Sequence, residues 1–254
     1  RAAAGRVAGA VRRTPLVPFR AGRSNSAGSA TDGRVDLRLK LECLQETGSF
    51  KARGATHQLA LLTADERAAG VVATRSGNHG KALAWAAEQA GVRATIVMPA
   101  NAYPNKIQAC RDHCAEVVLA PDREAAEALC AERVAAGAVL VHPYDAARTA
   151  AGAGTVGLEV CEDWPEVEVL IVPVGGGGLI TGCAVAAREA SGGRVRVLGA
   201  EPEGAPTMTR ALAEGRPVLN EPITTCVQGL CPPGVGRLNL DVARALVERV
   251  LTLT

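Results

Sequence analysis

The chain has 254 residues and a formal net charge of +2, and 48% of its residues are hydrophobic although only 2% are aromatic. This length buries enough apolar surface for one large domain or two modest ones, with a core of Ala, Val, Leu and Ile. The small net charge gives no argument for a nucleic acid or a membrane surface as partner, and no apolar stretch reaches the ~18 residues of a transmembrane helix.

Eight cysteines lie at irregular positions, mostly inside apolar runs. This distribution is typical of reduced thiols in a cytoplasmic protein, which is the location we expect. Cys110 and Cys114 lie one helical turn apart with His113 between them, but no second pair of ligands accompanies them. We therefore interpret them as packing residues and not as a zinc site.

The N-terminal segment, residues 1–13, is rich in arginine and contains no acidic residue, a composition that transit peptides share. The spacing of Val7, Ala10 and Val11 favours a first helix instead. The stretch at 21–33 is polar and rich in Gly and Ser, which predicts a mobile loop.

The first candidate site follows a predicted strand at 35–41, where apolar residues alternate with polar ones. A helix is expected to begin near Ser49, which places Lys51 beside unpaired backbone N–H groups and the positive end of a helix dipole. This environment favours the neutral amine, the form that attacks a carbonyl to make a Schiff base. Taken alone, Lys51 is better interpreted as an ordinary solvated lysine, so the case depends on two further loops.

The second candidate site is the sequence SGNHG at 76–80, between a predicted strand at 71–74 and a predicted helix at 81–90. Small residues at such a turn expose N–H groups and a helix N-terminus to an anionic ligand. Ser76 adds a hydroxyl and Asn78 adds an amide. His79 has two interpretations, a ligand contact or, more commonly near a helix start, a structural residue.

Strands and helices continue to alternate up to residue 141, which indicates a parallel sheet with helices on both faces. The expected elements are a strand at 94–98, a helix at 104–113, a strand at 116–119, a helix at 122–136 and a strand at 138–141. Strands at 35–41, 157–161, 169–172 and 195–200 are expected to form a second sheet.

The third candidate site is a run of four glycines, Gly175, Gly176, Gly177 and Gly178, between the predicted strand at 169–172 and a predicted helix at 179–190. A turn without β-carbons lets successive amides close around a phosphate. The alternative, a flexible loop, is not expected between a buried strand and an Ala-rich helix. No Lys-Ser/Thr pair follows the last glycine, so the run is not a Walker loop. Its match to a dinucleotide-binding fingerprint is weak.

The chain resembles pyridoxal-phosphate enzymes of the tryptophan synthase β-subunit fold type. The resemblance is carried by the three sites, which occur in the same order and with similar spacing: GSFKARGA, SGNHG and GGGGLITG. The closest resemblance is to the branch of serine racemases and serine/threonine dehydratases. RRTPL at 12–16, HPYD at 142–145, GAGT at 152–155 and AEPEGA at 200–205 extend it over nearly the whole chain.

This resemblance implies an α/β fold of two parallel-sheet, three-layer domains. Residues 1–69 plus 146–254 would form the large cofactor-binding domain, and residues 70–145 would form a small domain inserted in it. Relatives continue past residue 254 with a segment whose Ser or Thr pairs with the pyridine nitrogen, so we interpret the chain as a fragment that lacks a C-terminal part.

The resemblance also implies roles for the site residues. Lys51 would hold the aldehyde carbon of pyridoxal 5′-phosphate through a Schiff base, and the four glycines at 175–178 would bind its phosphate. Phe50 would lie against the ring, and Asn78 would hydrogen-bond the phenolic oxygen. The substrate carboxylate would bind to the loop formed by Ser76, Gly77, Asn78 and His79.

The implied activity is that of a dehydratase, or ammonia-lyase, which converts L-serine or L-threonine to a 2-oxo acid and ammonia. A serine racemase with side elimination activity is the alternative, in which Ser76 exchanges a proton on the face opposite Lys51. A truncated or non-catalytic family member is a second alternative. A homodimer is the expected assembly.

The sequence AEPEGA also resembles a divalent-cation site. Glu201 and Ala205 match two of its ligands, but Thr207 stands where a further acidic ligand is expected, which would weaken the binding of Mg²⁺ or Ca²⁺. Glu203 would then be the substitute for the missing acidic ligand, and an acidic strand end without a metal is an equal alternative. Gln228 and Arg75 also depart from the residues usual in the family, and for Arg75 we favour a solvent-exposed guanidinium over a role in binding a dicarboxylic substrate.

Overall fold

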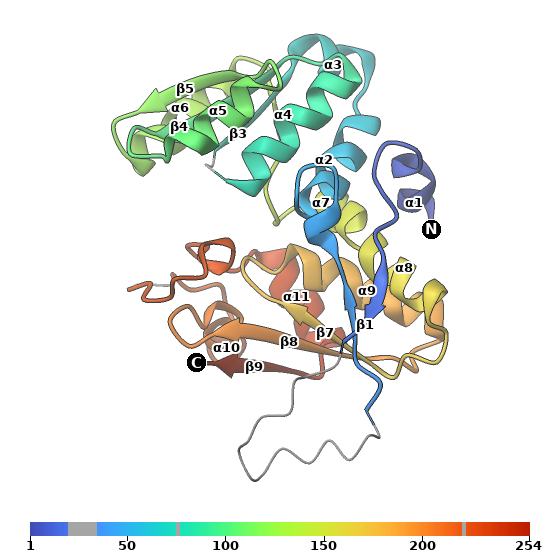
Figure 1. Cartoon of the computed structure of the whole chain (residues 1–254). Helices are drawn as coiled ribbons and strands as arrows, with labels where there is room; N and C mark the ends of the chain where they lie inside the picture. Colours follow the sequence, from blue (N-terminus) through green and yellow to red (C-terminus); the bar gives the residue numbers. More distant parts are fainter. Residues whose placement is uncertain (20–34, 75–76, 220–221) are drawn as a thin grey trace.

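Two parallel sheets and one antiparallel ribbon organise the computed structural model, which describes residues 1–19, 35–74, 77–219 and 222–254. The four-stranded sheet lies at the top of Figure 1 and the three-stranded sheet at the bottom. The predicted α/β class with parallel sheets is confirmed. The whole of the loop predicted at 21–33, together with Arg75 and Ser76, lies outside the described residues.

The four-stranded sheet has the order β5-β4-β3-β6, and its neighbouring strands are all parallel. Its strands are β3 (Val71–Thr74), β4 (Ala94–Pro99), β5 (Glu116–Ala120) and β6 (Val139–Leu140). The connecting helices are α4 (Asn78–Ala90), α5 (Pro104–Arg111) and α6 (Arg123–Ala135). One apolar cluster packs α4 against β3 and β4, and a second cluster packs α6 against the same two strands. Helices therefore cover both faces, as the alternating pattern predicted.

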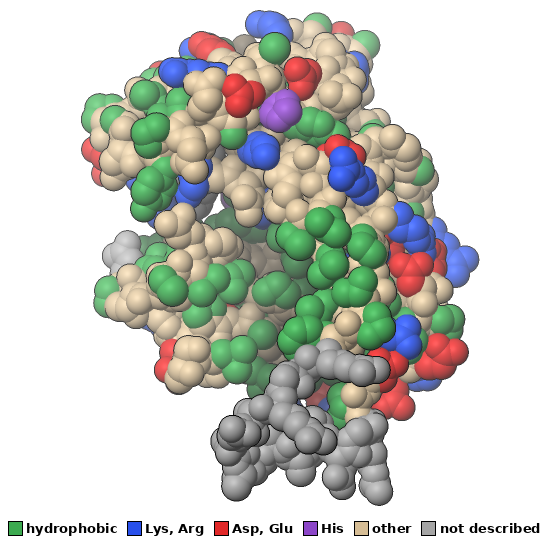
Figure 2. Space-filling view, in the orientation of Figure 1, with side chains coloured by type: hydrophobic (Ala, Val, Ile, Leu, Met, Phe, Trp, Pro, Cys, Tyr) green, Lys and Arg blue, Asp and Glu red, His purple; other side chains and the backbone are tan. Residues whose placement is uncertain are grey.

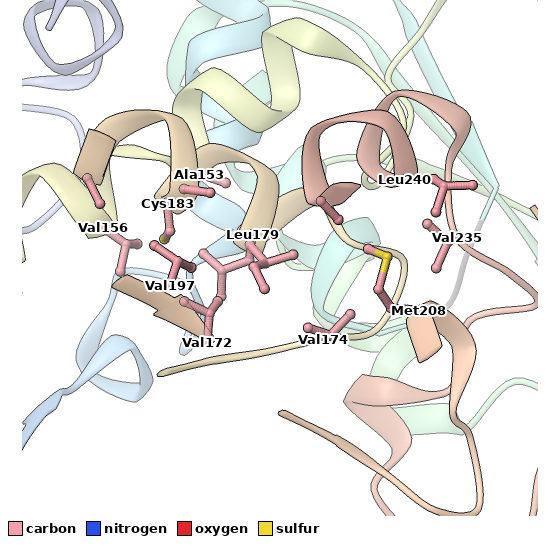
Figure 3. Packing of buried hydrophobic residues seen from close by; sticks show 14 of the residues in the cluster. Ala153, Val156, Val172, Val174, Leu179, Cys183, Val197, Met208, Val235 and Leu240 are labelled. Atoms are coloured by element: carbon pink, nitrogen blue, oxygen red, sulfur yellow. The ribbon is translucent and has the colours of Figure 1, made fainter. Parts of the chain in front are cut away.

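The three-stranded sheet has the order β7-β8-β9, formed by β7 (Val169–Pro173), β8 (Arg196–Pro202) and β9 (Arg249–Leu253). The helices near it are α8 (Thr155–Asp163), α9 (Gly178–Ser191), α10 (Thr207–Glu214) and α11 (Arg237–Leu246). Val172 and Val174 meet Leu179, Met208 and Leu240 in one core cluster (Figure 3). This core supports β7 and α9, the two elements that flank the glycine run.

The strand predicted at 35–41 does not join the three-stranded sheet. The structure has a short β2 (Arg38–Lys40) that pairs antiparallel with β1 (Leu16–Pro18). Leu37 and Leu39 remain exposed by 42% and 40%, so the described residues cover this ribbon only in part. Alternation of apolar residues indicates a strand but does not specify its partner, and the placement of this strand was therefore wrong.

The strand predicted at 157–161 was also wrong, because these residues belong to helix α8. A short apolar run does not distinguish a buried strand from a buried helix. The glycines of this region instead allow two helices to approach closely. A β-carbon on Gly154 would lie 2.5 Å from the carbonyl oxygen of Gly182, and one on Gly157 would lie 2.9 Å from Cα of Cys183, both in α9.

Helices α2 (Lys51–Ala60) and α7 (Ala147–Ala153) lie between the two parallel sheets (Figure 1). They touch through glycine, because a β-carbon on Gly152 would lie 2.5 Å from the carbonyl oxygen of Arg53. The remaining helical elements are α1 (Ala2–Val7), α3 (Ala64–Ala69) and the 3-10 turns η1 (Glu42–Leu44) and η2 (Gln228–Leu230). None of the helices in the described ranges has both the length and the apolar character to cross a membrane.

Candidate active site

Lys51 is the first residue of α2, and its side chain is half-buried. Its Nζ donates a 2.6 Å hydrogen bond to the carbonyl oxygen of Pro143, and it lies 5.0 Å from the centre of the Phe50 ring. The next residue, Tyr144, packs on the glycine run so closely that a β-carbon on Gly176 would overlap its ring. The segment 143–144 therefore brings the Lys51 amine and the glycine run together, although they are far apart in sequence.

The glycine run is a packed turn and not a flexible loop. Gly177 has φ of +93°, in the left-handed region, where a side chain is strained. A β-carbon there would lie 2.7 Å from Cβ of Asn239, and one on Gly178 would lie 2.9 Å from Cα of Tyr144. The N-cap residue of α9 is Gly177, which makes no side-chain cap hydrogen bond, and the backbone N–H groups at a helix start can bind an anion.

This arrangement fits a phosphate-bearing aldehyde. The turn is a cradle that side chains would fill, the start of a 14-residue helix follows it, and a half-buried primary amine lies beyond Tyr144. Glycine amides and a helix N-terminus bind phosphate, and a lysine amine reacts with an aldehyde. The residues present therefore fit pyridoxal 5′-phosphate.

Asn239 and Asp145 fasten the glycine turn to α11. Asn239 is fully buried, and its Nδ2 donates to the carbonyl oxygens of Gly176 at 2.8 Å and Tyr144 at 3.2 Å. The Asp145 carboxylate accepts two 3.2 Å hydrogen bonds from the backbone N–H groups of Arg237 and Leu238, at the start of α11. Sequence reasoning assigned no role to these residues. The motif HPYD contains Tyr144 and Asp145, but nothing in the sequence singled out Asn239.

The end of the second loop is linked to the glycine turn indirectly, through Lys106 and Gln228. Gly77 has φ of +111° and precedes α4, and a β-carbon on it would lie 4.0 Å from Lys106 Nζ. Lys106 donates a 3.0 Å hydrogen bond to Gln228 Oε1 in η2. The next residue, Gly229, lies against the turn, since a β-carbon on Gly175 would be 3.5 Å from its carbonyl oxygen. The molecular surface is hollowed between the upper and lower parts of the molecule (Figure 2).

The residues expected to bind substrate differ in their placement. Asn78 is the exposed first residue of α4, whereas His79 is buried and its Nε2 lies 2.8 Å from the carbonyl oxygen of Val141. This contact favours the structural interpretation of His79. Ser76 lies outside the described residues. Sequence reasoning missed Lys106, whose helix gave no sign that it reaches this loop.

A buried ionic network fixes the start of α2. Arg53, two residues after Lys51, is fully buried and bonds Glu42 at 2.8 Å and Glu159 at 2.5 Å. Burial alone would lower the pKa of the Arg53 guanidinium, but the two carboxylates outweigh this effect and hold the pKa above its ordinary value. Lys40 joins the network through a 2.6 Å contact with Glu159. The network holds the helix that positions Lys51.

The residues expected to hold a divalent cation make other contacts. Both oxygens of the buried Glu201 carboxylate accept 2.9 Å hydrogen bonds, from the N–H groups of Met208 and Thr209 at the start of α10. The carbonyl oxygen of Ala205 accepts from the backbone and the hydroxyl of Thr207. Within the described ranges, no group of three or more His, Cys, Asp or Glu side chains could hold a metal. These contacts favour the alternative of an acidic strand end without a metal, in which Glu201 acts as a helix cap.

Comparison with known proteins gives relatives along the whole chain. The L-threonine ammonia-lyase of Thermotoga maritima is 41% identical over 220 residues, which cover 86% of this chain and 55% of that protein. The serine racemase of Oryza sativa subsp. japonica is 36% identical over 255 residues, which cover all of this chain and 73% of that protein. The chain thus spans about half to three quarters of the length of these relatives.

Solved structures give the same result. A maize serine racemase superposes with a TM-score of 0.89 at 35% identity, covering 99% of this chain and 74% of that one. A threonine deaminase from T.th. superposes with a TM-score of 0.87 at 36% identity, covering 99% of this chain and 80% of that one. The sequence model of the family described as "Pyridoxal-phosphate dependent enzyme" matches residues 7–254. The chain belongs to this family of pyridoxal-phosphate dependent enzymes.

Proposed function

We propose that this chain carries the active site of an ammonia-lyase that acts on L-serine or L-threonine. One observation carries the proposal: the Lys51 amine bonds to Pro143, and the adjacent Tyr144 packs on the glycine turn. An amine and a phosphate cradle joined by two consecutive residues suit a small aldehyde that bears a phosphate. The similarity to an L-threonine ammonia-lyase supports the choice of reaction.

Each loop then has a task. When bound, pyridoxal phosphate supplies the electron sink that stabilises negative charge at the substrate Cα. Gly175–Gly178 and the first turn of α9 would bind the phosphate, Lys51 would hold the aldehyde carbon, and Phe50 would flank the ring. The Lys51 amine, once released, would take the proton from the substrate Cα. Gly77, Asn78 and the start of α4 would bind the substrate carboxylate.

The experiment for this proposal is a spectral titration of the purified chain with pyridoxal phosphate. A visible absorbance band of bound cofactor is expected, and Lys51→Ala should abolish it because no amine remains at this position. Lys81→Ala is the matched control, because it also removes a lysine amine. The hydrogen bond from Lys81 to Gly77 uses the backbone N–H, which this variant keeps, so the band should remain. A band that survives in Lys51→Ala would refute the assignment.

A serine racemase is the second candidate, favoured by the similarity of the whole chain to the rice serine racemase. In this case Ser76 would exchange a proton on the face of the substrate opposite Lys51. Ser76→Ala should then abolish the formation of D-serine and leave elimination from L-serine largely intact. Chiral chromatography and a 2-oxo acid assay measure the two products separately. Equal loss of both would contradict the two-face assignment.

The remaining expectations stay proposals. The homodimer, the cytoplasmic location and the division into residues 1–69 plus 146–254 and 70–145 rest on the resemblance and on the similarity to the relatives. The four-stranded sheet falls within 70–145 and the three-stranded sheet outside it, which is consistent with this division.

A further inference from the structure

Asn239 is a fully buried polar residue that the roles proposed above do not use. It lies in the first turn of α11 (Arg237–Leu246), and its side chain bonds to the interior of the protein. Its Nδ2 donates to two carbonyl oxygens, those of Gly176 and Tyr144, at 2.8 and 3.2 Å, and its Oδ1 accepts from the Thr181 hydroxyl at 2.9 Å. A buried amide with its donors and its acceptor engaged is rigid and specific in its contacts.

The contact with Gly176 fixes the direction of the glycine turn. Gly176 directly precedes Gly177, the residue with φ of +93°, and its carbonyl also accepts a 3.3 Å hydrogen bond from the N–H of Gly236. Because the carbonyl of Gly176 points to α11, the peptide that follows it has its N–H on the other side, toward the cradle. The Asn239 side chain, together with the N–H of Gly236, holds this peptide in that orientation.

The contact with Tyr144 ties the same amide to Lys51. Tyr144 follows Pro143, whose carbonyl oxygen accepts the 2.6 Å hydrogen bond from Lys51 Nζ. One side-chain nitrogen therefore holds both the turn for the phosphate and the segment that receives the lysine. The Asp145 carboxylate ties the same segment to the start of α11, so Asn239 lies where the helix, the glycine turn and the segment that receives the lysine meet.

We propose that Asn239 is a positioning residue that fixes the glycine turn relative to Lys51 and so sets the preference of the site for a phosphorylated cofactor. It touches neither cofactor nor substrate and acts through the carbonyls of Gly176 and Tyr144. The inference rests on the cofactor site of the proposed function and extends it to a residue outside the three motifs.

The test compares the binding of pyridoxal 5′-phosphate and of pyridoxal, which lacks the phosphate, by equilibrium dialysis with the cofactor-free chain. Asn239→Asp keeps the size of the side chain and its bond from Thr181, but a carboxylate cannot donate to the two carbonyls. We expect the Kd for pyridoxal phosphate to rise at least about tenfold, because charge-assisted bonds from the turn to the phosphate are lost. The Kd for pyridoxal should change by no more than about twofold, since it gains nothing from the turn.

Thr181→Val is the matched control, because it removes the third contact of Asn239 and leaves both donations to the carbonyls in place. It should bind pyridoxal phosphate within about threefold of the unmodified chain, as expected for one neutral hydrogen bond. Asn239→Ala removes the donors without adding a charge and replaces the aspartate variant if that variant fails to fold, as judged by circular dichroism.

Three results would overturn the proposal: unchanged binding of pyridoxal phosphate in the folded Asn239 variant, an equal loss for pyridoxal phosphate and pyridoxal, or an equal effect of Thr181→Val. Failure of the proposed function looks different. In that case the unmodified chain itself binds pyridoxal phosphate no better than pyridoxal, and Lys51→Ala changes neither.

Discussion

At the scale of single residues, the site is held in place by buried polar side chains that form hydrogen bonds and ion pairs with specific partners. Arg53 illustrates this, because its guanidinium is fully buried between Glu42 and Glu159 and also bonds the hydroxyl of Thr155 at 3.1 Å. Such a network contributes little net free energy when it is intact, but it is costly to break. Arg53 lies two residues after Lys51 in α2, so the network also keeps Lys51 in a fixed position.

We expect Arg53→Met to lower the free energy of unfolding by about 3–5 kcal/mol, because it leaves two carboxylates without their buried partner. Urea denaturation measures the change. Arg133→Met is the control, since Arg133 forms a long 3.5 Å pair with Glu116 at the surface, and such pairs contribute about 0–1 kcal/mol. If both variants lose the same free energy, the network does not stabilise the start of α2.

The residues of the site differed in how far the sequence predicted them. Lys51 and the four glycines were found because their chemistry depends on local spacing: a lysine at a helix start, and a turn without β-carbons before a helix. Asn239 and Lys106 were not found, because their roles come from contacts with residues more than sixty positions away. An isolated buried Asn or half-buried Lys carries no local signal.

At the scale of elements, glycine controls how closely the helices approach. Gly182 in α9 faces Gly154, the residue at the junction of α7 and α8, and a β-carbon on Gly182 would lie 2.5 Å from the backbone nitrogen of Gly154. It would also overlap the carbonyl oxygen of Ala150. This contact joins α9, which begins at the glycine turn, to the helices that follow Tyr144.

Gly182→Ala is expected to destabilise the fold by about 1–3 kcal/mol or more, since the helices must separate to admit a methyl group. Gly5→Ala in α1 is the matched control, because a β-carbon there meets nothing within 4 Å. This control should be neutral or stabilising by roughly 0.5–1 kcal/mol, the usual gain from Gly to Ala in a helix. Thermal denaturation followed by circular dichroism compares the two, and a neutral Gly182→Ala would show that the helices are not packed through these glycines.

The same contact explains where the prediction of elements failed. The run at 157–161 has the apolar composition of a strand, but Gly154 and Gly157 allow it to pack as helix α8 against α9. The strand at 35–41 was found but placed in the wrong sheet, because alternation does not reveal the partner strand. Elements of the four-stranded sheet were predicted well, since each apolar strand is followed there by a helix with clear end signals.

At the scale of the whole molecule, two parallel sheets flank a central pair of helices, α2 and α7 (Figure 1). The segment 143–144 links Lys51 to the glycine turn, and Lys106 with Gln228 links Gly77 to the same turn. Each motif-bearing loop follows a strand or begins a helix, the usual place for a ligand in an α/β protein. The order of the motifs was enough to predict the family and the α/β class. The cation site suggested by the same resemblance stays a prediction, and the structure shows the Glu201 carboxylate as a cap of α10.

The most direct test of the central claim is to identify the residue that holds the cofactor. Borohydride reduction of the chain loaded with pyridoxal phosphate fixes the cofactor permanently to the amine that carries its aldehyde carbon. Proteolysis and mass spectrometry should then find the phosphopyridoxyl group on Lys51, in a single major peptide. Modification spread over Lys40, Lys81 and Lys106, or absent from Lys51, would contradict the assignment of this lysine and of the glycine turn beside it.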